Sequence, residues 1–411
     1  MTGNTTIFYG GNIFVGNGHV LENASVIVEG EKIVKVARNL DNISRNAKKI
    51  SLNGCTLMPG LIDCHTHICL DSSIDPFETS KKDSLSKRIL KVARNAEKTL
   101  FSGVTTIRDM GGIDGVDLEI RNAINSGIIP GPRILASGKL ICTTGGHGWP
   151  IGREADGVDE IVKAVREQIK NGADLIKFMV TGGAMTAGSD PGAVQINERE
   201  LEAGIKEAQK AGKKTAAHAK GAKGIVIALR AGIDSIEHGT ILTEEAISLM
   251  LKKNIPVIFT LSALYNIENQ GIEAGLPNFL IDKALSYKPM RQQSILMAQK
   301  AGVVMAMGTD AGTPLNHHGN NPNELVRLVE IGYSPLQALM SATGIAAKVI
   351  GMDHCLGTIE EGKIADIIIL EGDPLKDISL FSTKCSLKLI AKEGQIVFKN
   401  NSLANEWYKK K

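Results

Sequence analysis

The sequence lacks the long apolar runs and the one-sided charge that mark whole classes of protein. No stretch of about 18 apolar residues occurs, so we expect no membrane-spanning helix. The first residues lack a basic segment followed by an apolar one, so we expect no secretory signal. The 47 basic and 44 acidic residues leave a net charge of only +3, which argues against an extended nucleic-acid or membrane footprint.

Paired cysteines and nucleotide-binding glycine motifs are also missing. The six cysteines form no CxxC pair and no disulfide-like spacing, so we expect reduced thiols and a cytoplasmic location. No glycine-rich dinucleotide motif and no P-loop is present. A chain of 411 residues needs no disulfides to stabilise it, because it is long enough to bury a large apolar core.

Both ends of the sequence alternate short β-rich stretches with glycine turns. Residues 6–9, 24–28 and 33–36 have this pattern, and it returns after residue 366. We therefore expect a small β-sandwich that is built from both termini, with residues 1–58 as one part and residues 355–411 as the other.

The central residues 59–354 alternate short apolar runs with segments of helical period, such as 85–101, 198–210 and 244–253. This alternation is typical of βα units and a parallel sheet. Eight runs fit a (β/α)8 TIM barrel, with an open doubly wound sheet as the alternative. The runs are 61–67, 104–110, 133–137, 175–180, 215–219, 235–239, 256–261 and 303–310.

Histidine, lysine and aspartate stand at the ends of several runs, where a buried parallel strand should be apolar. His65 and His67 end the first run, and their i, i+2 spacing places both side chains on one face of a strand. Alone, this pair fits a metal site about as well as two hydrogen-bonded core histidines. Lys177 lies within the fourth run, where an unpaired ammonium is costly to bury unless it snorkels outward.

The later runs repeat the pattern. His218 ends the fifth run, His238 the sixth and Asp310 the eighth. Four of only nine histidines thus occupy equivalent strand ends, which core packing alone does not explain. The carboxyl-terminal mouth of a barrel is where catalytic groups gather, so these ends predict an active site.

The motifs that carry these residues resemble the amidohydrolase superfamily nearly from end to end. Within it the chain is most similar to imidazolonepropionase-related and Xaa-Pro dipeptidase-like members. The matching segments are Met58-Pro-Gly-Leu-Ile-Asp-Cys-His-Thr-His67, Leu175-Ile-Lys-Phe178, Ala217-His-Ala219, Gly232-Ile-Asp-Ser-Ile-Glu-His-Gly239, Gly308-Thr-Asp-Ala-Gly-Thr-Pro314 and Leu356-Gly-Thr-Ile-Glu-Glu-Gly-Lys-Ile-Ala-Asp366.

The resemblance implies two divalent metal ions, with zinc the best fit to mixed nitrogen and oxygen ligands and manganese or cobalt as alternatives. The implied ligands are His65, His67, Lys177, His218, His238 and Asp310. The histidines of the first run would bind the more buried metal with Asp310, and those of the fifth and sixth runs would bind the second. Lys177 would be carboxylated and bridge both metals, and Asp310 would also move protons during catalysis.

Four residues are candidates for substrate contact. His147 looks like a family position that contacts a substrate carbonyl or carboxylate. Where one related subgroup has a carbonyl-polarising tyrosine, this chain has Lys220, so His147 or Tyr265 would supply that group instead. Lys220 itself is either a solvated lysine at the start of a helix or the partner of a substrate carboxylate. His318 either lines the pocket or lies on its rim, and residues 184–192 form a loop over the mouth.

The implied reaction is hydrolysis of an amide in a small molecule, such as an Xaa-Pro dipeptide or an N-acyl amino acid. Ring-opening of a cyclic amide is the nearest alternative. Deamination fits less well, because Lys177 is present and no glutamate follows His218 closely. A non-enzymatic scaffold protein on the same fold would be expected to lack some of the six metal ligands, whereas all six are present here. Related proteins often assemble, which suggests a homo-oligomer.

Overall fold

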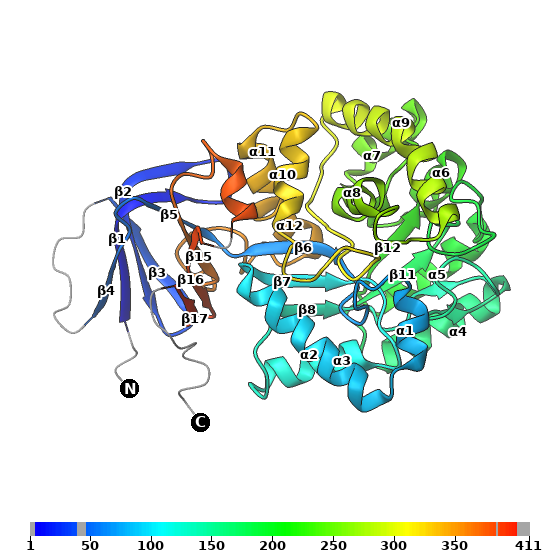
Figure 1. Ribbon diagram of the computed structural model, residues 1–411, viewed down its shortest axis with the longest axis horizontal. Coiled ribbons are helices and arrows are strands. Elements are labelled where there is room, and N and C mark those ends of the chain that lie inside the picture. Colours follow the sequence, from blue (N-terminus) through cyan, green and yellow to red (C-terminus); the bar gives the residue numbers. More distant parts are fainter. Residues whose placement is uncertain (1–4, 39–46, 384, 401–411) are drawn as a thin grey trace.

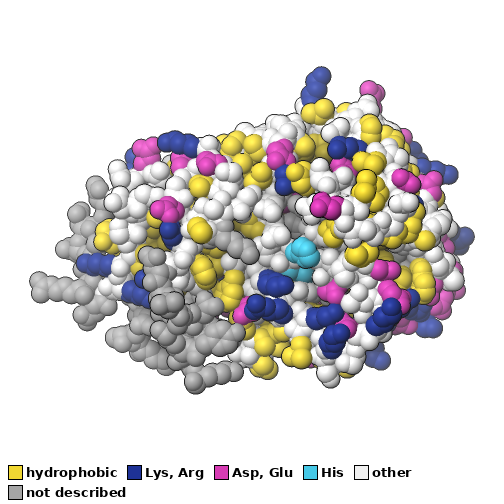
Figure 2. All heavy atoms as spheres, in the orientation of Figure 1, with side chains coloured by type: hydrophobic (Ala, Val, Ile, Leu, Met, Phe, Trp, Pro, Cys, Tyr) yellow, Lys and Arg dark blue, Asp and Glu magenta, His cyan; other side chains and the backbone are white. Residues whose placement is uncertain are grey.

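The computed structural model describes residues 5–38, 47–383 and 385–400. Strands from both termini form a sheet at one end of the molecule, and a larger body of parallel strands and helices lies beside it (Figure 1). Among the described residues, no helix combines the length and the apolar character that a membrane crossing requires. Basic and acidic side chains are interspersed over the visible face (Figure 2).

The terminal sheet has eight strands in the order β17-β16-β15-β5-β1-β2-β3, with β4 paired to β1. Its centre is β5, which pairs in parallel with β1 and antiparallel with β15, so the two ends of the chain meet edge to edge. The predicted sandwich of two facing sheets is not confirmed, because hydrogen bonds join all eight strands into one sheet. The strands are β1 (Thr5–Phe14), β2 (Val20–Glu29), β3 (Lys32–Ala37), β4 (Lys48–Ser51), β5 (Cys55–Pro59), β15 (Ile367–Glu371), β16 (Leu387–Lys392) and β17 (Gln395–Lys399).

The body contains two parallel sheets, β6-β7-β8 and β10-β9-β11-β12-β13-β14. Seven of the eight predicted runs contain one of these strands. The strands are β6 (Leu61–Thr66), β7 (Val104–Asp109), β8 (Arg133–Ala136), β9 (Ile141–Cys142), β10 (Arg153–Glu154), β11 (Leu175–Met179), β12 (Lys214–Ala219), β13 (Ser235–His238) and β14 (Val257–Ile258).

The eighth run, residues 303–310, was predicted as a strand and does not form one. It lies between β14 and β6 and is joined to both by backbone hydrogen bonds, with isolated bridges from Val257 to Met305 and, just beyond the run, from Thr66 to Ala311. Asp310, the last residue of the run, has a left-handed backbone (φ 60°). Parallel strands alternate with helices as the sequence predicts, whereas the closed barrel and the domain boundaries stay predictions.

Helices surround the parallel strands, and several begin where the sequence predicts. Side-chain caps start α2, α5, α7 and α11, with reciprocal capping boxes at Asn197 and Ser334. Their apolar faces pack on the sheets; Val92, Ala96 and Leu100 of α2 are fully buried. The helices are α1 (Pro76–Lys82), α2 (Leu85–Phe101), α3 (Val116–Asn125), α4 (Gly157–Lys170), α5 (Glu198–Lys210), α6 (Ala222–Ala231), α7 (Glu244–Lys253), α8 (Leu261–Gln270), α9 (Asn278–Ala301), α10 (Asn323–Glu330), α11 (Pro335–Ser341), α12 (Gly344–Ile350) and the short 3-10 helix η1 (Ile378–Ser382).

Candidate metal centre and active site

The parallel strands deliver their polar ends to one cavity of about 50 Å³. Because these strands run in the same direction, their carboxyl ends meet at one edge, as barrel enzymes require. The cavity brings together most of the residues that the sequence singled out. Its lining includes His67, His147, Lys177, His218, Lys220, His238 and Asp310, while His65 is fully buried beside it.

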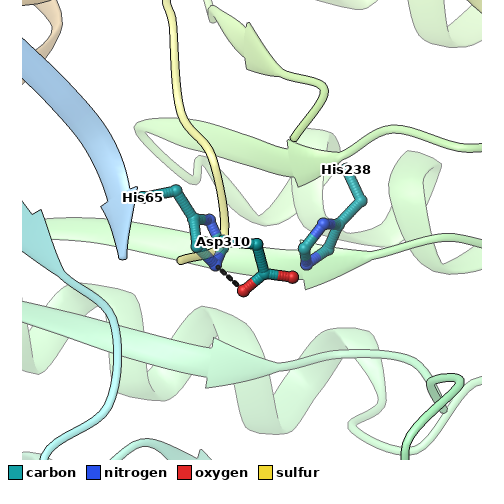
Figure 3. A group of neighbouring side chains, drawn as sticks. All are labelled: His65, His238 and Asp310. Carbon is teal, nitrogen blue, oxygen red and sulfur yellow. Dashed lines mark ion pairs between the residues drawn. The ribbon is translucent and has the colours of Figure 1, made fainter. Parts of the chain in front are cut away.

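His65, His238 and Asp310 form the tightest cluster, and their side chains point toward one another (Figure 3). One ligand atom from each lies within 4.8 Å of the others, as a shared metal ion requires. Asp310 Oδ1 is 3.4 Å from Nε2 of both His65 and His67. The rings of His218 and His238 are 4.5 Å apart, which extends the cluster toward a second set of ligands.

Three of these histidines are each held through one ring nitrogen. His65 Nδ1 donates to Glu237 at 2.7 Å, and His218 Nε2 donates to the Gly182 carbonyl at 2.9 Å. His238 Nδ1 shares a 2.7 Å hydrogen bond with Thr260 Oγ1. A neutral imidazole with one nitrogen fixed in this way offers the other as a lone pair. His65 Nε2 is buried and has no hydrogen bond among the described residues, so the donor set fits a divalent metal.

Burial sets the protonation of the cluster. It lowers the pKa of His67 to about 3, against a smaller opposing effect of Asp310. It also lowers the pKa of His218 and His238 well below the usual range. Burial alone would raise the pKa of Asp310, but His65, His67 and Lys177 lower it overall. Neutral imidazoles beside an ionised carboxylate are the protonation states in which these groups bind a metal.

Lys177 is a buried lysine with no fixed counter-charge. Its side chain is 1% exposed, and the part of the chain that the structure describes offers its ammonium neither a hydrogen bond nor an ion pair. Burial lowers its pKa to about 8, although Glu237 and Asp310 oppose the shift. A more neutral, accessible amine in the cavity is compatible with the predicted carboxylation.

The backbone around the cluster is unusual. His238, Thr260 and Asp310 all adopt left-handed φ angles, of 72°, 52° and 60°. Such conformations cost about 1–3 kcal/mol each in residues other than glycine and gather at functional sites. These three backbone conformations therefore lower the stability of the fold, and they lie at residues of the candidate site.

Sequence reasoning missed a buried relay beneath His65. Glu237 receives His65 Nδ1–H through one oxygen, and through the other it accepts from Arg108 at 2.9 Å and Ser235 Oγ at 2.6 Å. Arg108 Nε also donates to the Cys64 carbonyl at 2.6 Å. The sequence does contain a signal for this pair, because Glu237 and Arg108 each lie inside a strand that should be apolar. Opposite charges buried in one core are expected to pair.

Comparison with known proteins identifies the family of this chain. The model of the amidohydrolase family matches residues 56–397. The chain belongs to the amidohydrolase family. It is therefore a hydrolase that acts on amide bonds, in a family that generally uses divalent metals.

Relatives of this amidohydrolase match it over nearly their whole length. Ochratoxinase from Aspergillus niger is 31% identical over 421 residues, which cover 95% of this chain and 86% of that protein. An imidazolonepropionase from a Geobacillus species is 23% identical and covers 94% of this chain and 92% of its own. The crystal structure of a Xaa-Pro dipeptidase with bound methionine in the active site has a TM-score of 0.89 and 33% identity, covering 97% of this chain and 100% of that one.

The four predicted substrate contacts of the amidohydrolase separate into two pairs. His147 and Lys220 line the cavity and are buried, so Lys220 is not the solvated lysine that was the alternative. Tyr265 and His318 do not line it. The Tyr265 ring lies 3.4 Å from the Arg327 guanidinium, and His318 Nε2 is held by the Leu70 carbonyl at 3.1 Å. Each side chain is thus engaged by another part of the chain.

The loop after β11 covers the cavity as the sequence predicts. Ala184 and Met185 line the cavity, and Thr186 Oγ1 hydrogen-bonds His147 Nδ1 at 2.8 Å. From α9, Lys283 donates to the Thr186 carbonyl at 2.9 Å, and Tyr287 donates to Asp190 at 2.7 Å. We refer to residues 182–192 as the strap.

Proposed function

We propose that this chain is a binuclear metal-dependent amidohydrolase that cleaves an amide bond in a small molecule, such as an Xaa-Pro dipeptide or an N-acyl amino acid. The observation that carries the proposal is the set of buried histidines, each fixed through one nitrogen, around Asp310 and an unpartnered Lys177. In particular, His65 Nε2 is buried without a hydrogen bond among the described residues, whereas a buried polar atom in a purely structural role normally has a partner.

The proposed ligands fall into two groups that share Lys177. His65, His67 and Asp310 would hold one metal, His218 and His238 the other, and carboxylated Lys177 both. Zinc suits these nitrogen and oxygen donors best. Bound divalent ions would supply a water-derived nucleophile at neutral pH and Lewis-acid polarisation of the scissile carbonyl.

The remaining chemistry belongs to side chains of the protein. Asp310 is ionised and aims a carboxylate oxygen into the cavity, so it would accept a proton from the attacking water and pass it to the leaving amine. His147 is positioned by Thr186 and would contact the substrate carbonyl. The strap would exclude bulk water from the reacting groups.

The relatives support an amide that involves an amino acid. The name ochratoxinase and the Xaa-Pro dipeptidase structure belong to proteins at least 31% identical to this chain over almost its whole length. The imidazolonepropionase similarity, at 23% identity, makes a cyclic amide the alternative substrate.

Purified enzyme loaded with zinc should be assayed against three panels: dipeptides that include Xaa-Pro, N-acyl amino acids, and cyclic amides. The proposal expects turnover in one of the first two panels and its loss, by about 100-fold or more, in Asp310→Asn. Turnover confined to the cyclic panel would shift the assignment to ring-opening. No turnover by fully loaded protein in any panel would contradict amide hydrolysis of this class.

A further inference from the structure

Lys220 is a second buried lysine in the cavity, and it is held rigidly. Its side chain is 8% exposed and lines the cavity with His147, His238 and Asp310. Its backbone N–H donates to Thr181 Oγ1 at 3.0 Å, and its carbonyl accepts from Ile241 N–H at 2.9 Å. Both peptide groups are therefore fixed at the end of β12, and only the side chain is free to adjust.

The ammonium of Lys220 has no anionic partner among the described residues: no ion pair or hydrogen bond joins it to another side chain. Asp310 is the one acidic residue among the described lining residues, and it lies 3.4 Å from both His65 and His67. A buried charge without a partner costs several kcal/mol, so its retention indicates that an anion arrives with the ligand.

The surroundings restrict what that anion is. The cavity walls include the apolar side chains of Met179, Leu264 and Ile267. A small charged group on an apolar body fits such walls better than a highly charged ligand does. In the proposed mechanism the metals polarise the scissile carbonyl, which leaves Lys220 for a separate, permanently negative group.

We propose that Lys220 determines specificity by binding a free carboxylate on one half of the amide substrate. This inference rests on the proposed function, because it assumes that the cavity holds an amide. It narrows the substrates to amides that carry a carboxylate near the scissile bond, and it excludes fully neutral amides as good ligands. A carboxylate bound at the Lys220 ammonium would make a charge-assisted hydrogen bond with it.

Binding of a matched pair of probes tests the inference without requiring turnover. N-acetyl-L-methionine and its carboxamide differ in one group, which is a negatively charged carboxylate in the first and a neutral amide of similar shape in the second. Titration calorimetry on the zinc-loaded protein should show tighter binding of the acid. In Lys220→Met the acid should bind about 10- to 100-fold more weakly, while the carboxamide changes less than about threefold. Lys220→Arg should recover part of the preference for the acid.

Lys214→Met is the matched control, because Lys214 is an exposed lysine at the opposite end of the same strand. It should leave binding of both probes unchanged. Equal weakening of both probes in Lys220→Met, or no weakening of either, would overturn the inference. Thermal unfolding of each variant checks that it is folded, and Lys220→Gln serves if the methionine variant is not.

The outcomes also separate the inference from the proposed function. A charge preference that depends on Lys220 in a protein that hydrolyses none of the panels would keep the carboxylate site and reject the hydrolase assignment. Turnover of carboxylate-bearing and neutral amides at equal rates, in both the wild type and Lys220→Met, would keep the hydrolase and reject the carboxylate site.

Discussion

At the scale of single residues, the buried relay from His65 to Glu237 and Arg108 orients the candidate metal centre. Glu237 is fully buried, and its pKa stays low because Arg108 and His65 outweigh the effect of burial, which alone would raise it. An ionised Glu237 keeps the proton of His65 on Nδ1 and the lone pair on Nε2, where the metal would bind.

Replacing Glu237 by glutamine keeps the shape but removes the charge. We expect zinc affinity to fall by about 10- to 100-fold, because a ligand loses the partner that fixes its tautomer. Competition with a fluorescent chelator measures this affinity directly. Glu202→Gln, on the exposed face of α5, is the control and should behave as the wild type. Equal zinc affinity in wild type and Glu237→Gln would show that the relay serves packing alone.

Most of the candidate ligands were predictable because each is a polar residue where a buried strand should be apolar. His65, Lys177, His218 and His238 satisfy that rule, and the structure brings them to one cavity. Whether Tyr265, in α8, and His318 line the cavity was not predictable, because the direction of each side chain depends on partners far away in sequence. For Tyr265 that partner is Arg327, which lies 62 positions later in the chain.

At the scale of elements, α8 starts on a buried carboxylate. Glu324 of α10 accepts the N–H groups of Leu261 at 2.6 Å and Ser262 at 2.8 Å, which are unpaired at the start of a helix. Burial nonetheless raises the pKa of Glu324 to about 7. The folded protein therefore binds this proton more tightly than the unfolded chain does.

This shift predicts how stability changes with pH. Between about pH 4.5 and pH 7 the folded state holds the Glu324 proton more often than the unfolded state, so this group's contribution to stability falls as pH rises. Urea unfolding should show the wild type losing up to roughly 3 kcal/mol relative to Glu324→Gln between pH 5 and pH 8. A difference between the two proteins that stays constant with pH, or grows in favour of the wild type, would contradict the assignment.

The strap contributes to the lining of a cavity of about 50 Å³, which is small for an amide with two substantial halves, so we expect the strap to move when a ligand binds. Tyr287→Phe removes the hydrogen bond to Asp190 that ties the strap to α9. We expect amide hydrogen exchange in residues 182–192 to speed up by about fivefold. Tyr333→Phe is the control, because the buried Tyr333 hydroxyl has no partner among the described residues. If residues 182–192 exchange at the same rate in Tyr287→Phe and in the wild type, the hydrogen bond from Tyr287 to Asp190 does not hold the strap in place.

Element boundaries were predictable where local chemistry decides them. The segments 198–210 and 244–253 are helices as expected, because Asn197 and Thr243 cap them. The eighth predicted strand does not form, because contacts with distant segments rather than local chemistry decide its conformation. Residues 303–310 make backbone hydrogen bonds to β6 and β14 without forming a regular ladder, and no local pattern in these residues reveals this.

At the scale of the whole molecule, Arg133 connects the body to the terminal sheet. From β8 it pairs with Asp366, just before β15, at 2.7 Å, and with Glu393, in the turn before β17, at 2.6 Å. That both termini build one sheet was predictable from their matching composition, but its strand order was not, because pairing between distant segments leaves no local signal.

Arg133→Met should therefore weaken the junction between the two parts. Removing one partner leaves the buried Asp366 carboxylate uncompensated, so we expect the free energy of unfolding to fall by on the order of 3 kcal/mol. Arg166→Met breaks an exposed pair with Glu207 and should cost less than about 1 kcal/mol. Urea unfolding measures both variants. An equal loss of unfolding free energy in the two would show that Arg133 does not stabilise the junction between the body and the terminal sheet more than an exposed ion pair does.

In the proposed site Lys177 bridges two metal ions. Elemental analysis of protein purified without chelator tests this bridge, with Lys177→Ala beside the wild type and Lys214→Ala as the control. We expect about two metal ions per chain in the wild type and the control, and a sharp fall in Lys177→Ala. One metal per chain that is unaffected by loss of Lys177 would contradict it.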